Sequence, residues 1–197
     1  MMKDTIATIF AKSITAKQQF LYESGEALVA VIEEVVRSLR SGGKLLLFGN
    51  GGSAADAQHI AAEFVNRYLI ERPPLPAIAL TTDTSALTSI LNDYGGDVVF
   101  AKQIQALGKK GDVAIALSTS GNSVNVLRGI AACRELGIRT IGLTGGTGGI
   151  MAQKVDHLLC VSATSVTPRI QEAHILIGHT ICELVDLALF GEIQDQA

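Results

Sequence analysis

The chain has 197 residues, with 16 basic and 19 acidic side chains and a formal net charge of -3; this length is usual for one domain and buries a core without disulfides or a structural metal. No block of Lys and Arg offers a footprint for a phosphate backbone, so a nucleic-acid partner is not expected. The hydrophobic content of 48%, with 5% aromatics and no Trp, is typical of helices packed on a parallel sheet through Ala, Ile, Leu and Val.

A long helical region is the first predicted element. Apolar residues recur at helical spacing from about Asp4 to Leu39 without a proline, and Gly42 and Gly43 end the pattern. One or two helices are therefore expected in residues 1–40. The first ten residues lack the apolar run of a signal peptide, and no later run approaches the ~20 apolar residues of a membrane span. We expect a cytoplasmic protein with no membrane partner.

Short apolar runs then alternate with helical patterns. In chain order, the expected elements are a strand at 44–48, a helix from about 52 to Tyr68, a strand at 77–80, helical stretches at 85–92 and 98–107, a strand at 112–117, a helix ending near Leu136, strands at 140–144 and 157–161, and a helix from Thr167 to about Phe190. Thr167 is expected to cap the last helix, with Pro168 in its first turn.

This alternation predicts the fold class. Strands separated by helices imply right-handed parallel crossovers, so we expect an α/β fold with a doubly wound, flavodoxin-like parallel sheet flanked by helices. No linker marks a second domain. Residues 44–190 are expected to form the α/β core of a single domain that spans residues 1–197.

Two strand-to-helix loops carry the residues of a phosphate site. Residues 49–53 (Gly-Asn-Gly-Gly-Ser) and 118–123 (Ser-Thr-Ser-Gly-Asn-Ser) each follow an expected strand and precede an expected helix. Glycines let backbone N–H groups approach a phosphate, hydroxyls donate further hydrogen bonds, and a helix N-terminus favours negative charge. One such loop alone is as consistent with a simple turn, but two of the same form favour a ligand. Neither loop has the spacing of a nucleotide motif.

The loops resemble the signatures of the SIS (sugar isomerase) domain family, and the likeness covers nearly the whole chain. The segments that carry it are residues 48–59, 61–63, 92–93, 117–123 and 169–179, which together resemble phosphoheptose isomerases in particular. The resemblance implies the SIS fold, with residues 1–40 as a helical oligomerisation region. It also implies a cytoplasmic homotetramer that converts D-sedoheptulose 7-phosphate to D-glycero-D-manno-heptose 7-phosphate, the first step toward ADP-heptose for lipopolysaccharide.

The same resemblance implies a role for individual residues. The implied substrate contacts are Asn50, Gly51, Gly52, His59, Glu63, Asn92, Asp93, Ser118, Thr119, Ser120, Ser123 and Gln171. One zinc ion per subunit is implied, and its implied ligands are His59, Glu63, Gln171 and His179. Glu63 and His179 match the acid/base pair of the family, and the loop of residues 118–123, called the hydroxyl loop below, would take the phosphate.

The chemistry is consistent with these roles. Aldose-ketose isomerisation moves protons between adjacent carbons and their oxygens, so it needs a base, an acid and stabilisation of an enediol-like charge. His59 and Glu63 stand four apart on an expected helix and share one face, although such a pair alone is also common as a solvated surface contact. Arg67 would lie on the same face and either attract the anionic substrate or stabilise the end of the helix. Because a carboxylate bound to zinc is a weaker base, the role of Glu63 stays open.

Gln171 and His179 indicate a site shared between subunits. They are eight residues apart, which on one helix means about 12 Å of rise and about 80° of rotation. One metal can hardly bind both directly, so we expect them to serve one site from different chains. The other histidines, His157 and His174, are expected to have structural or surface roles.

Two other functions remain open. Noncatalytic SIS adaptors that bind the bacterial replication initiator have a segment similar to residues 71–80, but they depart from the isomerases at the positions of Glu63 and His179, which this chain keeps. A sugar-phosphate-sensing regulatory domain is the second alternative. It would be expected to carry a DNA-binding segment, and the sequence shows none.

Overall fold

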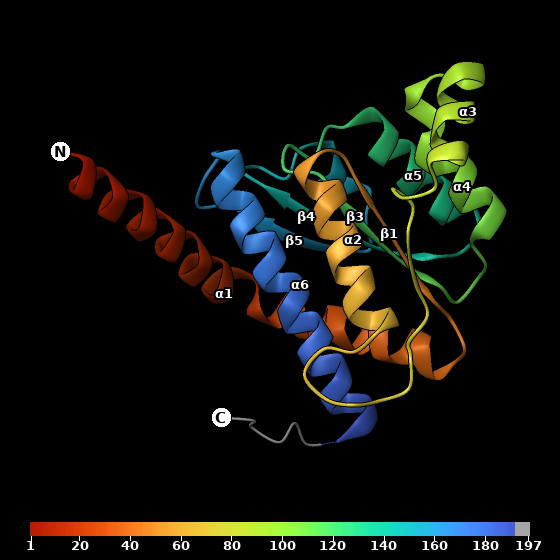
Figure 1. Ribbon diagram of the computed structural model, residues 1–197, viewed down its shortest axis with the longest axis horizontal. Helices are drawn as coiled ribbons and strands as arrows, with labels where there is room; N and C mark the ends of the chain where they lie inside the picture. Colours follow the sequence, from red (N-terminus) through yellow and green to blue (C-terminus); the bar gives the residue numbers. More distant parts are fainter. Residues whose placement is uncertain (192–197) are drawn as a thin grey trace.

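A computed structural model describes residues 1–191 of the chain as a five-stranded parallel sheet with helices on both faces (Figure 1). The strands lie in the order β2-β1-β3-β4-β5, which is the flavodoxin-like order. Their bounds are β1 Leu45–Gly49, β2 Ala77–Ala79, β3 Val113–Leu117, β4 Arg139–Gly145 and β5 His157–Val161. The predicted fold class is therefore confirmed.

The central strands β1 and β3 are buried along their whole length. Alternate side chains enter different cores: Leu45 and Leu47 point into one, Leu46 and Phe48 into the other. Helices that cover both faces of a parallel sheet require apolar residues on both, which explains why these strands are unbroken apolar runs in the sequence. The register pairs Gly49 with Leu117, so the loops that follow β1 and β3 begin side by side.

The helices form two layers around the sheet. Helices α1, α2 and α6 pack on one face, α4 and α5 pack on the other, and α3 stands beyond the sheet beside α4 (Figure 1). The bounds are α1 Met2–Arg40, α2 Gly52–Val65, α3 Thr84–Tyr94, α4 Val99–Leu107, α5 Val124–Glu135 and α6 Thr167–Phe190, with short 3-10 helices η1 Gly96–Val98 and η2 Ile150–Gln153. Within residues 1–191, α3 buries none of its own side chains.

The N-terminal part of α1 extends away from the body of the protein (Figure 1). Ile6, Phe10, Ile14 and Leu21 are 50%, 66%, 53% and 66% exposed. They recur at helical spacing and therefore form one apolar stripe. Exposed apolar surface of this extent is unusual on a monomeric soluble protein.

Two local expectations are wrong. Helix α2 ends at Val65 and does not reach Tyr68; the backbone N–H of Asn66 closes the last turn on the carbonyl of Ala62 at 2.9 Å. At the start of α6, Val166 occupies the N-cap position and Thr167 is already helical. Pro168 lies in the first turn as expected, where its missing N–H costs no intrahelical hydrogen bond.

Helix α6 is long and apolar enough to cross a membrane by length and composition, with a mean hydropathy of 1.5 in its most apolar window. A core helix of a globular protein meets the same test. Helix α6 contacts α1, α2 and β4, and 44% of that window is buried in this chain. Its packing therefore accounts for its apolar character.

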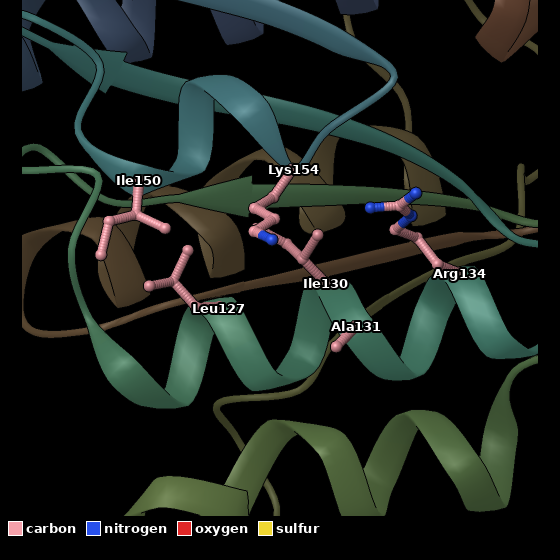
Figure 2. A pocket seen from close by; sticks show the side chains of 6 residues that line it. All are labelled: Leu127, Ile130, Ala131, Arg134, Ile150 and Lys154. Carbon is pink, nitrogen blue, oxygen red and sulfur yellow. The ribbon is translucent and has the colours of Figure 1, made fainter.

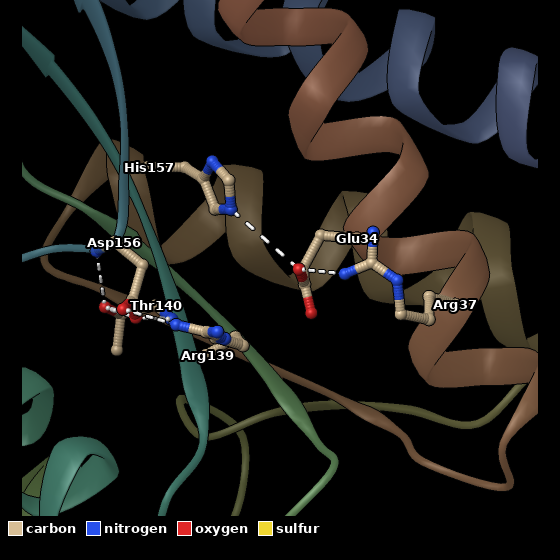
Figure 3. Close-up of polar contacts among 6 residues, drawn as sticks. All are labelled: Glu34, Arg37, Arg139, Thr140, Asp156 and His157. Atoms are coloured by element: carbon tan, nitrogen blue, oxygen red, sulfur yellow. Dashed lines mark hydrogen bonds and ion pairs between the residues drawn. The ribbon is translucent and has the colours of Figure 1, made fainter.

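Figure 3 draws two groups of polar contacts: one joins α1 to β5 at the edge of the sheet, and the other joins β4 to the residue before β5. Glu34 on α1 accepts a hydrogen bond from Arg37 at 2.6 Å and lies 4.0 Å from His157 Nε2 at the start of β5. Asp156, just before β5, accepts two hydrogen bonds of 2.8 Å from Thr140. Burial raises the pKa of this carboxyl, but the hydrogen bonds outweigh burial and the pKa is lowered. His157 thus takes part in a structural contact.

Candidate active site

The candidate site begins where β1 and β3 end. This is the switch point of the sheet, because β1 continues to β2 on one side and β3 continues to β4 on the other. Ligands of such folds bind at the carboxyl ends of the strands at this point. The two loops are joined there: Asn50 and Asn125 exchange two side-chain hydrogen bonds, each of 2.9 Å. Asn125 was not among the predicted site residues.

The hydroxyl loop after β3 presents a row of small polar groups before α5. The hydroxyls of Ser118 and Ser123 are 3.0 Å apart and hydrogen-bonded. Ser120 Oγ accepts a hydrogen bond from the backbone N–H of Asn122 at 3.2 Å. Helix α5 starts at Val124, so its unpaired N-terminal N–H groups point toward this loop. The arrangement provides hydroxyl and N–H donors together, which suits an anion.

The loop after β4, residues 145–149, packs against the hydroxyl loop. Gly121 has a φ of +66°, and a side chain there would collide with the carbonyl oxygen of Gly148. Asn122 Oδ1 accepts a hydrogen bond of 3.0 Å from the backbone N–H of Ile150. The shape of the hydroxyl loop therefore depends on close backbone contact, and only glycine permits it at position 121.

The loop after β1 leads into the N-terminus of α2. Gly51 has a φ of +56° and occupies the N-cap position. Gly52 lies directly against the side-chain amide of Gln171 on α6, so closely that a Cβ at position 52 would overlap the amide nitrogen. Of the predicted site residues, Gln171 is thus placed beside Gly52 at the start of α2.

Farther along, α2 and α6 bring three titratable side chains together: His59, Glu63 and His179. The Nε2 atoms of His59 and His179 are 2.9 Å apart, and His59 Nε2 lies 3.2 Å from Glu63 Oε1. The candidate ligand atoms of all three residues lie within 4.8 Å of one another. His59 and Glu63 converge because they are one helical turn apart on α2, as predicted.

These three residues fit a metal ion. Two imidazole nitrogens and one carboxylate oxygen form a ligand set that catalytic zinc sites use, with a further position left open. The three ligand atoms already face one another within residues 1–191, and Glu63 and His179 are only partly exposed. The cluster could therefore hold one divalent ion without a rearrangement of the backbone.

Tyr68 completes the wall of this cluster. Its ring stacks on His179, with centroids 5.6 Å apart and planes at 27°. Burial raises the pKa of the Tyr68 hydroxyl, and the charges of nearby acidic groups, Glu63 among them, raise it further. The sequence analysis did not identify Tyr68 as a site residue. It lies in the irregular segment after α2, where helical spacing does not predict which way a side chain points.

Arg67 does not lie where the sequence analysis placed it. Helix α2 ends at Val65, so Arg67 shares no helical face with Glu63. Its guanidinium lies 3.4 Å from the carboxylate of Glu71, and both side chains are half or more exposed. The expectation that Arg67 continues the face of Glu63 is wrong.

Asn92 and Asp93 lie apart from the other predicted residues. They are at the C-terminal end of α3, both exposed, and Asn92 Nδ2 donates a hydrogen bond of 2.8 Å to Asp93.

His174 is fully buried in α6, and its Nε2–H donates to the carbonyl of Thr144 at 3.1 Å. Burial lowers the pKa of His174 to about 4, so it is neutral at pH 7 and serves the core.

A separate hollow of about 310 Å³ lies between α5 and η2 (Figure 2). Leu127, Ile130 and Ile150 line it, with Arg134 and Lys154 at its edge. It is mainly apolar and contains none of the predicted site residues. The three-residue cluster lies on the opposite face of the sheet, where α2 and α6 pack.

Comparison with known proteins agrees with this geometry. The SIS domain family model matches residues 9–145. A phosphoheptose isomerase of Roseiflexus sp. strain RS-1 is 54% identical over 180 residues, covering 91% of each chain. The structure of a phosphoheptose isomerase from Neisseria gonorrhoeae superimposes with a TM-score of 0.89 at 47% identity, over 94% of this chain and 99% of that one. A phosphoheptose isomerase from Francisella tularensis gives a TM-score of 0.90 at 38% identity, over 94% and 98%.

Proposed function

The chain belongs to the SIS-domain family and, within it, to the phosphoheptose isomerases, and we propose that its His59–Glu63–His179 cluster is the acid/base centre that acts on D-sedoheptulose 7-phosphate. The protein is an aldose-ketose isomerase whose product is D-glycero-D-manno-heptose 7-phosphate. The observation that supports the proposed centre is the convergence of these three side chains, two from α2 and one from α6, in a set that could hold a metal ion. The product leads to ADP-heptose.

In this proposal the substrate is held at two ends. The hydroxyl loop takes the phosphate through Ser118, Thr119, Ser120 and Ser123, since hydroxyl and N–H donors meet there. Asn50, Gly51 and Gly52 lie at the neighbouring helix N-terminus and contact the sugar. The remaining proposed substrate contacts are His59, Glu63, Asn92, Asp93 and Gln171. Fixing both ends holds carbons 1 and 2 against the acid/base pair.

Proton transfer is assigned to Glu63 and His179. One removes the proton from the carbon beside the carbonyl, and the other delivers a proton to the oxygen, which gives an enediol-like intermediate. A bound zinc ion would stabilise the negative charge that develops on the oxygens. His59, Glu63 and His179 of one chain would hold it, with Gln171 from a second chain as a further proposed ligand. Glu63 could serve as the base in place of a zinc ligand, and assays with and without metal distinguish the two roles.

Turnover of the heptose phosphate tests this function directly. The purified protein is incubated with D-sedoheptulose 7-phosphate, and the aldose is detected, in a metal-free sample and after addition of zinc. We expect turnover in the zinc-supplemented sample; equal turnover without metal would show that zinc is dispensable. A folded protein that gives no aldose in either sample would contradict the enzyme and favour the adaptor function.

The proposed assembly is a cytoplasmic homotetramer with one zinc ion per subunit and active sites between subunits. The apolar stripe of α1 supports an interface, because it has no partner within residues 1–191. The spacing along α2 supports a shared site: Gly52 and Glu63 are eleven residues apart, about 16 Å of helix rise. Within one chain the loops and the acid/base cluster therefore lie at opposite ends of α2. In the proposed assembly, the loops of one chain would face the cluster of another.

Disrupting the stripe is expected to abolish activity together with assembly. Phe10→Asp places a charge on the apolar face, so we expect smaller species in analytical ultracentrifugation and a loss of turnover by about 10²-fold or more, as acid/base groups leave the site. Gln19→Asp is the matched control, since nine residues place it on the opposite face of α1. A folded Phe10→Asp monomer with full activity would overturn the shared site.

A further inference from the structure

Arg72 lies at the centre of a buried polar junction between the two helices of the candidate site. Its Nε donates a hydrogen bond of 2.6 Å to Asp186 on α6, and the two side chains are 1% and 0% exposed. Its Nη2 donates to the carbonyl oxygen of Glu63 at 2.9 Å, and its Nη1 to that of Phe64 at 3.0 Å. One guanidinium thus joins the C-terminal end of α2 to α6.

The junction solves a problem at the end of α2. The last carbonyls of a helix have no intrahelical donors, and here they are buried against α6. The planar fork of an arginine can serve several acceptors at once in a fixed geometry, which a lysine cannot. The carbonyl that Nη2 binds belongs to Glu63 itself, so Arg72 holds the backbone of a proposed acid/base residue.

On α6, Arg72 holds the segment that carries His179 through its hydrogen bond to Asp186. Asp186 follows His179 by seven residues, which returns to the same face of α6 about 10 Å farther along. A second contact lies just before His179: a Cβ at Gly178 would be 2.5 Å from Ile60 Cδ1, so the helices touch there. The cluster is therefore held between a close steric contact and the Arg72–Asp186 pair.

We propose that the buried Arg72–Asp186 pair is a positioning device that fixes the register of α2 against α6 and thereby the convergence of Glu63 with His179. The hydrogen bonds of Arg72 go to Asp186 and to backbone carbonyls, and not to the cluster side chains, so it is a positioning residue and not a catalytic one. A slide of either helix by one residue is about 1.5 Å, enough to separate atoms that now lie 2.9 Å apart. The inference rests on the proposed role of the cluster.

The test separates positioning from stability. The double variant Arg72→Met with Asp186→Leu removes both buried charges, because removing one alone would leave an isolated charge. Lys44→Met with Asp112→Asn is the matched control: that pair is 2.6 Å apart and 18% and 0% exposed, and its residues precede β1 and β3 and belong to neither α2 nor α6. Zinc affinity of the metal-free proteins is measured by competition with a chromogenic chelator, together with kcat, KM and the melting temperature.

We expect the Arg72/Asp186 double variant to bind zinc about 10- to 100-fold more weakly and to lose kcat by a similar factor, as outer partners of metal ligands do. Its KM is expected to stay within about threefold, because the hydroxyl loop is untouched. The Lys44/Asp112 control is expected to keep zinc affinity and kcat even where its melting temperature falls. A folded double variant with zinc affinity and kcat within about threefold of the parent overturns the proposal.

Arg72→Lys keeps the test decisive if the double variant does not fold. It retains a charge beside Asp186 but loses the fork, so smaller losses of zinc affinity and kcat are expected. A folded Arg72→Lys variant that matches the parent in both overturns the proposal as well. If the parent itself fails to convert the heptose phosphate, the proposed function fails, while the zinc affinities still decide whether Arg72 positions the cluster.

Discussion

Glu63→Gln is expected to lower kcat for D-sedoheptulose 7-phosphate by about 10²- to 10⁴-fold, the usual contribution of general acid/base catalysis. The amide is nearly the same size as the carboxylate, so the contact with His59 Nε2 at 3.2 Å can persist as a hydrogen bond. It cannot accept the proton from carbon, and it binds a cation more weakly. The hydroxyl loop is unchanged, so KM is expected to change much less than kcat.

Coupled detection of the aldose product, at several substrate concentrations, measures both constants. Glu71→Gln is the matched control, because it makes the same chemical change at an exposed carboxylate. Within residues 1–191, the ion-pair partner of Glu71 is the surface residue Arg67. Its activity is expected to equal that of the parent. Should Glu63→Gln retain more than about a tenth of the parental kcat, Glu63 would not be the base.

Gly121→Ala is expected to raise KM by about tenfold or more and to destabilise the fold. The residue has a φ of +66°, and the new Cβ would strike the carbonyl oxygen of Gly148. Relief of that collision moves the hydroxyl loop away from residues 145–149. Each charge-assisted hydrogen bond that the phosphate then loses is worth about 1.5–3 kcal/mol, or at least tenfold in binding.

Gly146→Ala separates the collision from the backbone preference. Its φ of +60° is similar, but a Cβ there meets nothing within 4 Å. Both variants are expected to lose about 1–2 kcal/mol of stability from the left-handed conformation, measured by thermal unfolding. Only Gly121→Ala is expected to impair KM. Equal KM values for the two variants would show that the hydroxyl loop does not bind the phosphate.

Much of the fold was predictable from residue patterns. The apolar runs at residues 44–48 and 112–117 correspond to β1 and β3, because strands covered on both faces need apolar side chains on both. The convergence of His59 and Glu63 was predictable for a similar reason: a four-residue spacing on a helix brings two side chains to one face. In each case the repeat of the strand or helix determines which way a side chain points, and that repeat can be recognised in the sequence.

Residues outside regular elements could not be placed in this way. No residue pattern indicated that α2 ends at Val65. Because the helix ends there, Arg67 lies off the face of Glu63 and Tyr68 stacks on the ring of His179. Arg72, seven residues past the end of the helix, donates hydrogen bonds to the carbonyls of Glu63 and Phe64 and thereby stabilises this ending. Helix periodicity carries no information about such a partner.

The sequence by itself determined the order of strands and helices, the two Gly/Ser loops and the chemical types of the acid/base residues, because each depends on local spacing and composition. The meeting of His179 with His59 and Glu63, 120 and 116 residues away in the chain, was decided by the packing of α6 on α2. That packing depends on a glycine contact and a buried ion pair between distant segments. Only the tertiary structure brings such segments together.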